Sequence, residues 1–100
     1  MKTNTITQLE NLMKAVEAAT GLHQETLLSH TRIKVISETR MIFYYLAYRD
    51  LSCTLQQIAD FMDRRVSVVF SGIRRIHDYI RYDDIAMQVR QIRKLYKQSL

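Results

Sequence analysis

The sequence predicts an all-α fold, a compact bundle of helices in a single domain. The 100 residues include no proline and only two glycines, Gly21 and Gly72, which favours helices joined by short connections. With 47% hydrophobic and 25% charged side chains, the chain can bury one core and is too short for a second. Apolar residues also recur at helical spacing along most of the chain. We therefore expect residues 1 to 100 to form one helical domain.

The first expected helix carries an apolar stripe at positions i, i+3, i+7 and i+10, formed by Ile6, Leu9, Met13 and Val16. Gly21 follows as a C-cap residue. Residues 22 to 37 show no sustained period and predict a short helical turn followed by an irregular loop. Ser37 is then the expected N-cap of a helix from Glu38 to Asp50. We expect the aromatic residues of this helix to form core and rim rather than a platform for stacking bases: Phe43, Tyr44, Tyr45 and Tyr48.

Residues 55 to 81 predict a helix-turn-helix. Thr54 and Gln57 have the spacing of a capping box, which starts a helix from Leu55 to Met62. After a polar connection, a longer amphipathic helix carries the apolar stripe Val69, Ile73, Ile76 and Ile80. Ala59 and Gly72 are small, as residues must be where the two helices cross closely.

A last helix is expected over residues 84 to 98. Its apolar stripe is Ile85, Val89, Ile92 and Tyr96, and its opposite side is basic. The stripe could support a homodimer, but we expect it to cover the chain's own core, which favours a monomer.

The charge is basic and unevenly distributed. The formal net charge is +5, and residues 32 to 100 hold 13 basic against 7 acidic groups. Such a field attracts polyanions, most often nucleic acid, although an acidic protein or a membrane surface would respond similarly.

The sequence lacks the residue patterns that several classes of function require. Two glycines fifty-one positions apart cannot form a phosphate-binding loop. His23, His30, His77 and Cys53 show no metal-ligand spacing, and no nucleophile has an orienting partner. We therefore expect no enzyme, metal or cofactor. The longest apolar run, Met41 to Tyr48, is far below the ~20 residues of a membrane span, so we expect a cytoplasmic protein with a small buried thiol at Cys53.

Double-stranded DNA is the partner that the second helix of the helix-turn-helix suits best. A helix fits the major groove, and Arg64 and Arg65 before it can meet phosphates. Base edges are in reach of Ser67, Val68 and Ser71 on its first turns. Arg74 and Arg75 are farther along and are expected to contact the backbone.

The chain from about Ile6 to Ile80 resembles the C-terminal duplex-binding domain of the bacterial chromosomal replication initiator, DnaA, and the last helix resembles that family's last helix. The matching segments are Leu27-Leu28-Ser29, a basic loop with Arg32 and Lys34, Arg40, Tyr45-Leu46-Ala47, Leu55 with Gln57-Ile58-Ala59, Phe61-Met62, and Arg64, Ser67, Val69 and Arg75-Ile76. The resemblance implies an all-α helix-turn-helix domain similar to that of the Trp repressor.

Residue roles follow from this resemblance. Arg32 corresponds to an arginine that enters the minor groove, Lys34 to its basic neighbour, Arg40 to a phosphate contact and Ser67 to a base contact. The family's signature Arg-Asp-His-Ser/Thr-Thr-Val is replaced here by RRVSVV, residues 64 to 69, which lacks the Asp-His pair. The family's ATPase module is absent from these 100 residues. We therefore expect a detached, nucleoid-associated DNA reader that acts in replication initiation or its regulation, in transcription control or for a mobile element, alongside other replication or regulatory proteins.

One rival of a different class stays open. The lost Asp-His pair could indicate a degenerate reading helix, and the basic surface would then dock an acidic partner as a protein-interaction module. RNA binding ranks last, because the usual pattern of exposed stacking aromatic residues is lacking.

Overall fold

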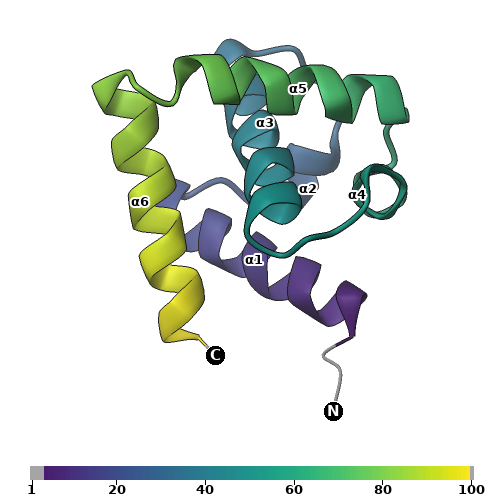
Figure 1. The fold of residues 1–100 in the computed structure, drawn as a ribbon, viewed down its shortest axis with the longest axis horizontal. Coiled ribbons are helices and arrows are strands. Elements are labelled where there is room, and N and C mark those ends of the chain that lie inside the picture. The colour runs from purple at the N-terminus through teal and green to yellow at the C-terminus, as the bar shows by residue number, and fades with distance from the viewer. Residues whose placement is uncertain (1–3, 100) are drawn as a thin grey trace.

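The computed structural model describes residues 4–99, so residues 1–3 and 100, at the ends of the expected domain, lie outside the described residues. Six helices follow one another in this range with no strand: α1 (Thr5–Thr20), α2 (Gln24–Leu28), α3 (Lys34–Arg49), α4 (Leu55–Met62), α5 (Val66–Tyr79) and α6 (Asp83–Gln98). The all-α prediction is confirmed. In Figure 1, α3 runs through the middle, α5 lies across one end, and α6 runs from α5 back toward α1. No helix within residues 4–99 has the length and apolar character needed to cross a membrane.

Helix α1 has caps at both ends. The Asn4 side chain accepts a hydrogen bond from the Ile6 N–H at 2.7 Å, and Gly21 ends the helix in the left-handed region with a φ of 74°. The C-cap prediction for Gly21 is therefore confirmed. Ile6 was expected in the apolar stripe but is 53% exposed. The buried face of α1 begins one turn later and consists of Leu9, Leu12, Met13, Ala15 and Val16.

Helix α6 begins at Asp83, one residue before the expected start, and ends at Gln98 as expected. Ile85, Val89 and Ile92 are buried, and α6 packs against α1. The apolar stripe is thus covered within the chain itself.

Helix α3 begins four residues earlier than expected. Its first residue is Lys34, and Ser37 lies inside the first turn, where its N–H donates to the Ile33 carbonyl at 2.9 Å. The prediction of Ser37 as N-cap is therefore wrong. The physical reason is burial, since Ile36 is only 7% exposed and anchors this first turn in the core.

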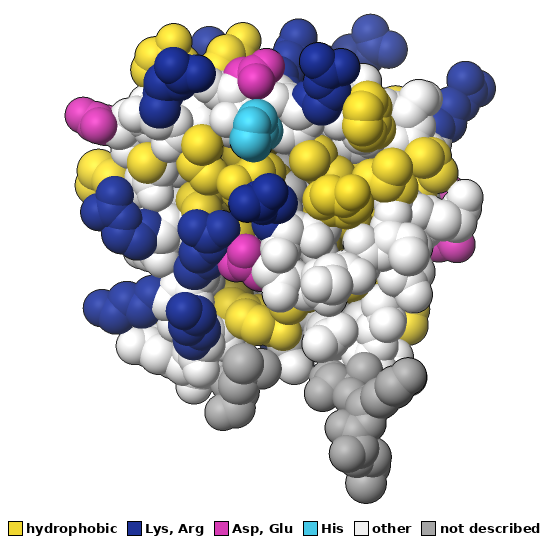
Figure 2. Space-filling view, in the orientation of Figure 1, with side chains coloured by type: hydrophobic (Ala, Val, Ile, Leu, Met, Phe, Trp, Pro, Cys, Tyr) yellow, Lys and Arg dark blue, Asp and Glu magenta, His cyan; other side chains and the backbone are white. Residues whose placement is uncertain are grey.

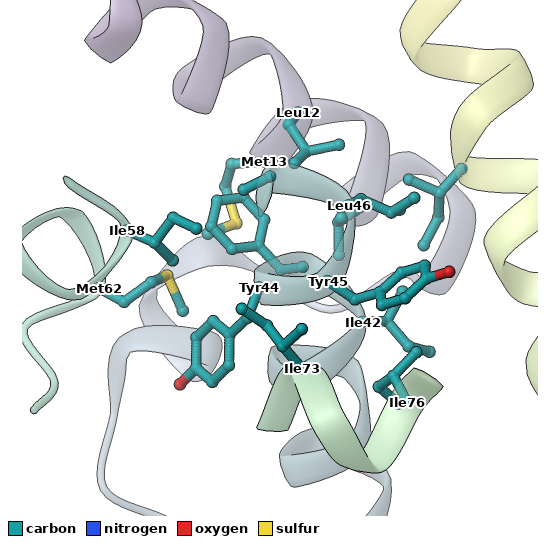
Figure 3. Packing of buried hydrophobic residues seen from close by; sticks show 14 of the residues in the cluster. Leu12, Met13, Ile42, Tyr44, Tyr45, Leu46, Ile58, Met62, Ile73 and Ile76 are labelled. Carbon is teal, nitrogen blue, oxygen red and sulfur yellow. The ribbon is translucent and has the colours of Figure 1, made fainter. Parts of the chain in front are cut away.

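The core forms around α3. Every side chain from position 42 to position 47 is buried, and Figure 3 shows side chains of α1, α4 and α5 converging on this helix. Phe43 stacks on Phe61, with ring centroids 5.8 Å apart. Tyr48, by contrast, is 45% exposed, so the expectation of core and rim is confirmed. Cys53 is also buried, as expected, and this burial raises the pKa of its thiol.

The helix-turn-helix follows from local sequence signals. The Gln57 N–H donates to the Thr54 hydroxyl at 3.1 Å and the Thr54 N–H to the Gln57 side-chain oxygen at 2.8 Å, so the capping box and the bounds of α4 are as predicted. Asp63 ends α4 in the left-handed region with a φ of 54°, and the Arg64 N–H donates to the Ala59 carbonyl at 2.9 Å. This turn directs the chain into α5.

Gly72 lets α5 approach α3 closely. A Cβ atom at this position would lie 2.9 Å from the Tyr44 Cδ2 atom and 3.0 Å from the Met41 Cγ atom, too close for ordinary contact. The expected close crossing at Gly72 therefore exists, but it is with α3 rather than with α4. The packing of α5 on α3 determines which side chains of α5 point outward.

Candidate nucleic-acid interface

The outer face of α5 is exposed and basic. With Val69, Gly72, Ile73 and Ile76 buried against the core, helical spacing turns a set of predicted contact residues outward. These exposed residues are Ser67, Val68, Ser71, Arg74 and Arg75, together with Arg65 at the N-cap. In Figure 2, Lys and Arg side chains gather along the edge of the molecule formed by α5.

A hollow of about 460 Å³ lies between α5 and the N-terminal half of α3. Its α5 wall carries four of the predicted residues: Ser67, Val68, Ser71 and Arg75. The opposite wall contains Ser37, Met41 and Tyr44, and the lining also includes Arg40, Arg64 and Gly72. The lining is rich in hydroxyl and guanidinium groups and includes no carboxylate.

Arg74 faces the other side of α5. Its guanidinium carbon lies 5.8 Å from the centre of the Phe70 ring, which is a cation–π contact. Arg74 also lines a separate hollow with Tyr48 and Arg49. The predicted α5 residues therefore divide into two groups along the two flanks of the helix.

Arg32 and Lys34 are both exposed, but they do not share one loop. Arg32 lies in the connection between α2 and α3, whereas Lys34 is the first residue of α3. Lys34 and Arg75 line a second hollow that continues along α5 toward α6. The structure thus places Lys34 next to the C-terminal part of α5.

Arg40, expected to contact phosphate, is buried and donates hydrogen bonds within the protein from all three guanidinium nitrogens. Only 7% of the residue is exposed. Its Nε donates to the Leu27 carbonyl at 2.6 Å, Nη1 to the Thr31 carbonyl at 2.7 Å and Nη2 to the Ser29 carbonyl at 2.7 Å. In the structure the guanidinium group of Arg40 binds the backbone of α2 and the following loop, whereas the expected phosphate contact would use it as a free cation.

Arg64 reaches the same segment from the turn of the helix-turn-helix. Its Nη2 donates to the Ser29 carbonyl, and its Nη1 donates to the Met62 carbonyl at 3.1 Å. Arg64 is half-buried, and these bonds tie the guanidinium group expected at a phosphate to the protein backbone. We call Arg40 and Arg64, with the carbonyl groups that they bind, the arginine clasp.

The arginine clasp carries two positive charges close together. Within residues 4–99 neither guanidinium has a carboxylate partner, since the ion pair found there joins Arg93 to Asp50. Burial lowers the pKa of Arg40, and the charge of Arg64 lowers it further. The carbonyl dipoles of residues 26 to 31 supply the compensating negative ends of the hydrogen bonds. The clasp fixes the loop that contains Arg32 against both α3 and the turn before α5.

Sequence patterns did not indicate the arginine clasp or one exposed aromatic pair. The acceptors of the clasp are backbone carbonyl groups, which have no signature in the sequence. The aromatic pair, Tyr79 and Tyr82, flanks the end of α5 with ring centroids 5.9 Å apart. Their positions outside the stripe of Val69 and Ile76 were the signal that could have marked them as exposed.

Replacement of Arg40 tests the clasp. We expect Arg40→Lys to lower the free energy of unfolding by about 2–4 kcal/mol, because a lysine cannot satisfy several buried carbonyl groups at once. Urea denaturation measures this change, and hydrogen exchange should report loss of protection at residues 27 to 31. The control is Arg49→Lys, an exposed arginine on the same helix, for which a change below about 0.5 kcal/mol is expected. Equal effects of the two substitutions would contradict the clasp.

Comparison with known protein families gives a match to this chain. Residues 9–76 match the family model described as the bacterial dnaA protein helix-turn-helix, and α6 lies outside the matched residues. The chain matches no curated protein and no solved structure. Because the matched segment covers more than half of the 100 residues and contains the exposed face of α5 up to Ile76, the chain belongs to the bacterial DnaA helix-turn-helix family, a family of DNA-binding domains.

Proposed function

We propose that this protein binds double-stranded DNA with sequence preference, with α5 in the major groove and the loop around Arg32 at the adjacent minor groove. The observation that carries the proposal is the exposed, basic outer face of α5, presented by a helix-turn-helix of the DnaA family. Binding alone is sufficient for the proposed role, since an occupied site excludes competing proteins. That role is the control of replication initiation or of transcription on intracellular DNA.

Phosphate contacts supply most of the proposed affinity. Arg65 stands at the N-terminus of α5, where the free N–H groups of the first turn also favour an anion. Arg75 and Lys34 line the flank toward α3, and Arg74 lies on the other flank. Cations on both flanks of a helix suit the two phosphate backbones that border a major groove.

The centre of the outer face of α5 offers only a few kinds of base contact. Ser67 and Ser71 offer hydroxyl groups, which bond to several bases and discriminate weakly. Val68 is 46% exposed and apolar, so its best partner in the major groove is the 5-methyl group of thymine. The proposed preference is therefore for thymine at the positions that Val68 touches.

The minor-groove contact is assigned to Arg32. This side chain is exposed on a loop that the arginine clasp holds against the rest of the domain. Arginine favours narrow minor grooves because their negative potential is enhanced, and A·T-rich tracts have such grooves.

Salt dependence and Arg65→Ala test the proposed duplex binding itself. We expect the dissociation constant, measured by fluorescence anisotropy on random and initiator-box duplexes, to rise steeply between ~50 and ~200 mM salt. Arg65→Ala should weaken binding to all sequences similarly and reduce the logarithmic salt slope by about 1. Lys14→Ala, an exposed lysine on α1, is the control and should change neither. Absence of duplex affinity at low salt would favour the rival role of docking an acidic protein.

Removal of thymine methyl groups tests Val68. On a duplex selected by the protein from random sequences, replacing thymine by deoxyuridine in the contacted positions should weaken binding about fourfold per methyl group, the equivalent of ~0.8 kcal/mol. The variant Val68→Ala should bind the two duplexes equally, whereas Val68→Thr, which keeps a methyl group, should retain part of the difference. A wild-type protein that does not distinguish the two duplexes would exclude this contact.

Substitution of Arg32 tests the minor-groove contact. We expect Arg32→Ala to reduce binding more on sites flanked by A·T-rich tracts than on sites flanked by G·C-rich tracts. The reason is that the variant loses the arginine contact with the narrow minor groove of A·T-rich DNA. Lys34→Ala, which removes a phosphate contact, should reduce binding to both equally. Equal losses for Arg32→Ala in the same titrations would reject its role.

A further inference from the structure

Two tyrosines are exposed together where α5 meets α6. Tyr79, in the last turn of α5, is 44% exposed, and Tyr82, the N-cap of α6, is 57% exposed. Their ring centroids lie 5.9 Å apart and their planes are tilted by 54°. By contrast, Tyr44 and Tyr45 are buried in the core. Two aromatic rings exposed side by side form a small apolar patch beside the basic face, and such patches are typical of binding sites.

The two rings border a hollow of about 520 Å³ between α3, α5 and the start of α6. Its lining also includes the charged side chains Lys34, Glu38, Arg75 and Asp84. Ser37, Met41 and Arg75 line both this hollow and the one beside the reading face of α5. The two hollows are therefore neighbours along one flank of α5.

The chemistry of this hollow suits a nucleobase better than a bare phosphate. Aromatic rings offer a face on which any base can stack. The carboxylates of Glu38 and Asp84 repel phosphate but accept hydrogen bonds from a base, for example from the N4 amino group of cytosine. Lys34 and Arg75 can neutralise the phosphates on either side of such a base. A base pair inside a duplex presents only its edges, so the base must be unpaired.

We propose that this hollow binds one unpaired nucleobase of a DNA strand that continues out of the duplex seated on α5. Tyr79, Tyr82 and Asp84 lie beyond residues 9–76, the segment matched to the DnaA helix-turn-helix family, so family membership does not supply this site. The duplex measurements below rest on the proposed function, whereas binding of a single strand alone does not.

Duplexes with single-stranded extensions provide the test. Anisotropy titrations compare a blunt duplex, the same duplex with four unpaired deoxycytidines at the 5′ or the 3′ end of either strand, and the same extensions made of abasic units. The abasic units keep the phosphates and lack the bases. We expect at least one deoxycytidine extension to tighten binding about fivefold or more, and its abasic counterpart to give little of this gain.

Three tyrosine variants locate the effect. Tyr82→Ala should remove the gain while leaving affinity for the blunt duplex within about twofold, because Tyr82 lies outside the proposed duplex contacts. Tyr82→Phe keeps the ring and should keep the gain. Tyr48→Ala is the matched control, since Tyr48 is 45% exposed but lines a different hollow. Thermal unfolding of each variant verifies its fold.

The outcomes separate the two proposals. A gain that survives in Tyr82→Ala, disappears equally in Tyr48→Ala, or appears with abasic units overturns the base site, as does the absence of any gain with all extensions. A protein that binds blunt duplex normally in those cases retains its proposed function. If no duplex binds, a twelve-residue deoxycytidine strand tests the site alone: binding that Tyr82→Ala weakens supports it, and any other result overturns it.

Discussion

The arginine clasp holds together the parts from which the proposed DNA interface is built. Arg40 extends from the middle of α3 and donates to three carbonyl groups of α2 and the following loop at 2.6–2.7 Å, and Arg64 binds the same segment from the turn before α5. A loop of five residues has little apolar surface of its own to bury. Hydrogen bonds from two guanidinium groups replace that missing burial, because each satisfies backbone acceptors that would otherwise be left without partners.

This arrangement assigns different tasks to residues of the same type. Arg40, which is buried, and Arg64, which is half-buried, bind the protein backbone, while the exposed Arg32, Arg65, Arg74 and Arg75 are available to a polyanion. A count of basic residues overestimates the charge that can meet DNA, since burial and geometry decide which groups are free. The packing of α5 on α3 also depends on Gly72, because a side chain at this position would collide with Tyr44.

In this packing, the chemical character of the exposed surface changes along α5. Its first turns present Ser67, Val68 and Ser71 beside a hollow rich in hydroxyl and guanidinium groups. Its last turn presents Tyr79 beside a hollow that mixes aromatic rings with both signs of charge. The first part suits the edges of paired bases and the second part suits the face of an unpaired one. In our proposals a single helix thus joins two modes of nucleic-acid recognition along one flank.

Local interactions explain what the sequence by itself determined. The capping box at Thr54 and Gln57 defined α4 to the residue, Gly21 ended α1 as expected, and apolar periodicity located α5 and α6. Family membership followed from residues 9–76, a segment that includes α4 and most of α1 and α5 but not α6. Signals of this kind act within one or two helical turns, so they are legible in a single sequence.

Tertiary structure alone decided the start of α3, the role of Arg40 and the meeting of Tyr79 with the hollow beside Lys34. Ile36 extended α3 because the folded core was there to bury it. Arg40 found acceptors 9 to 14 positions earlier in the chain, and those acceptors are backbone carbonyl groups that every residue possesses. These partners are distant in the sequence and belong to the backbone, so no residue pattern marks them. Only the packed fold brings them within hydrogen-bonding distance.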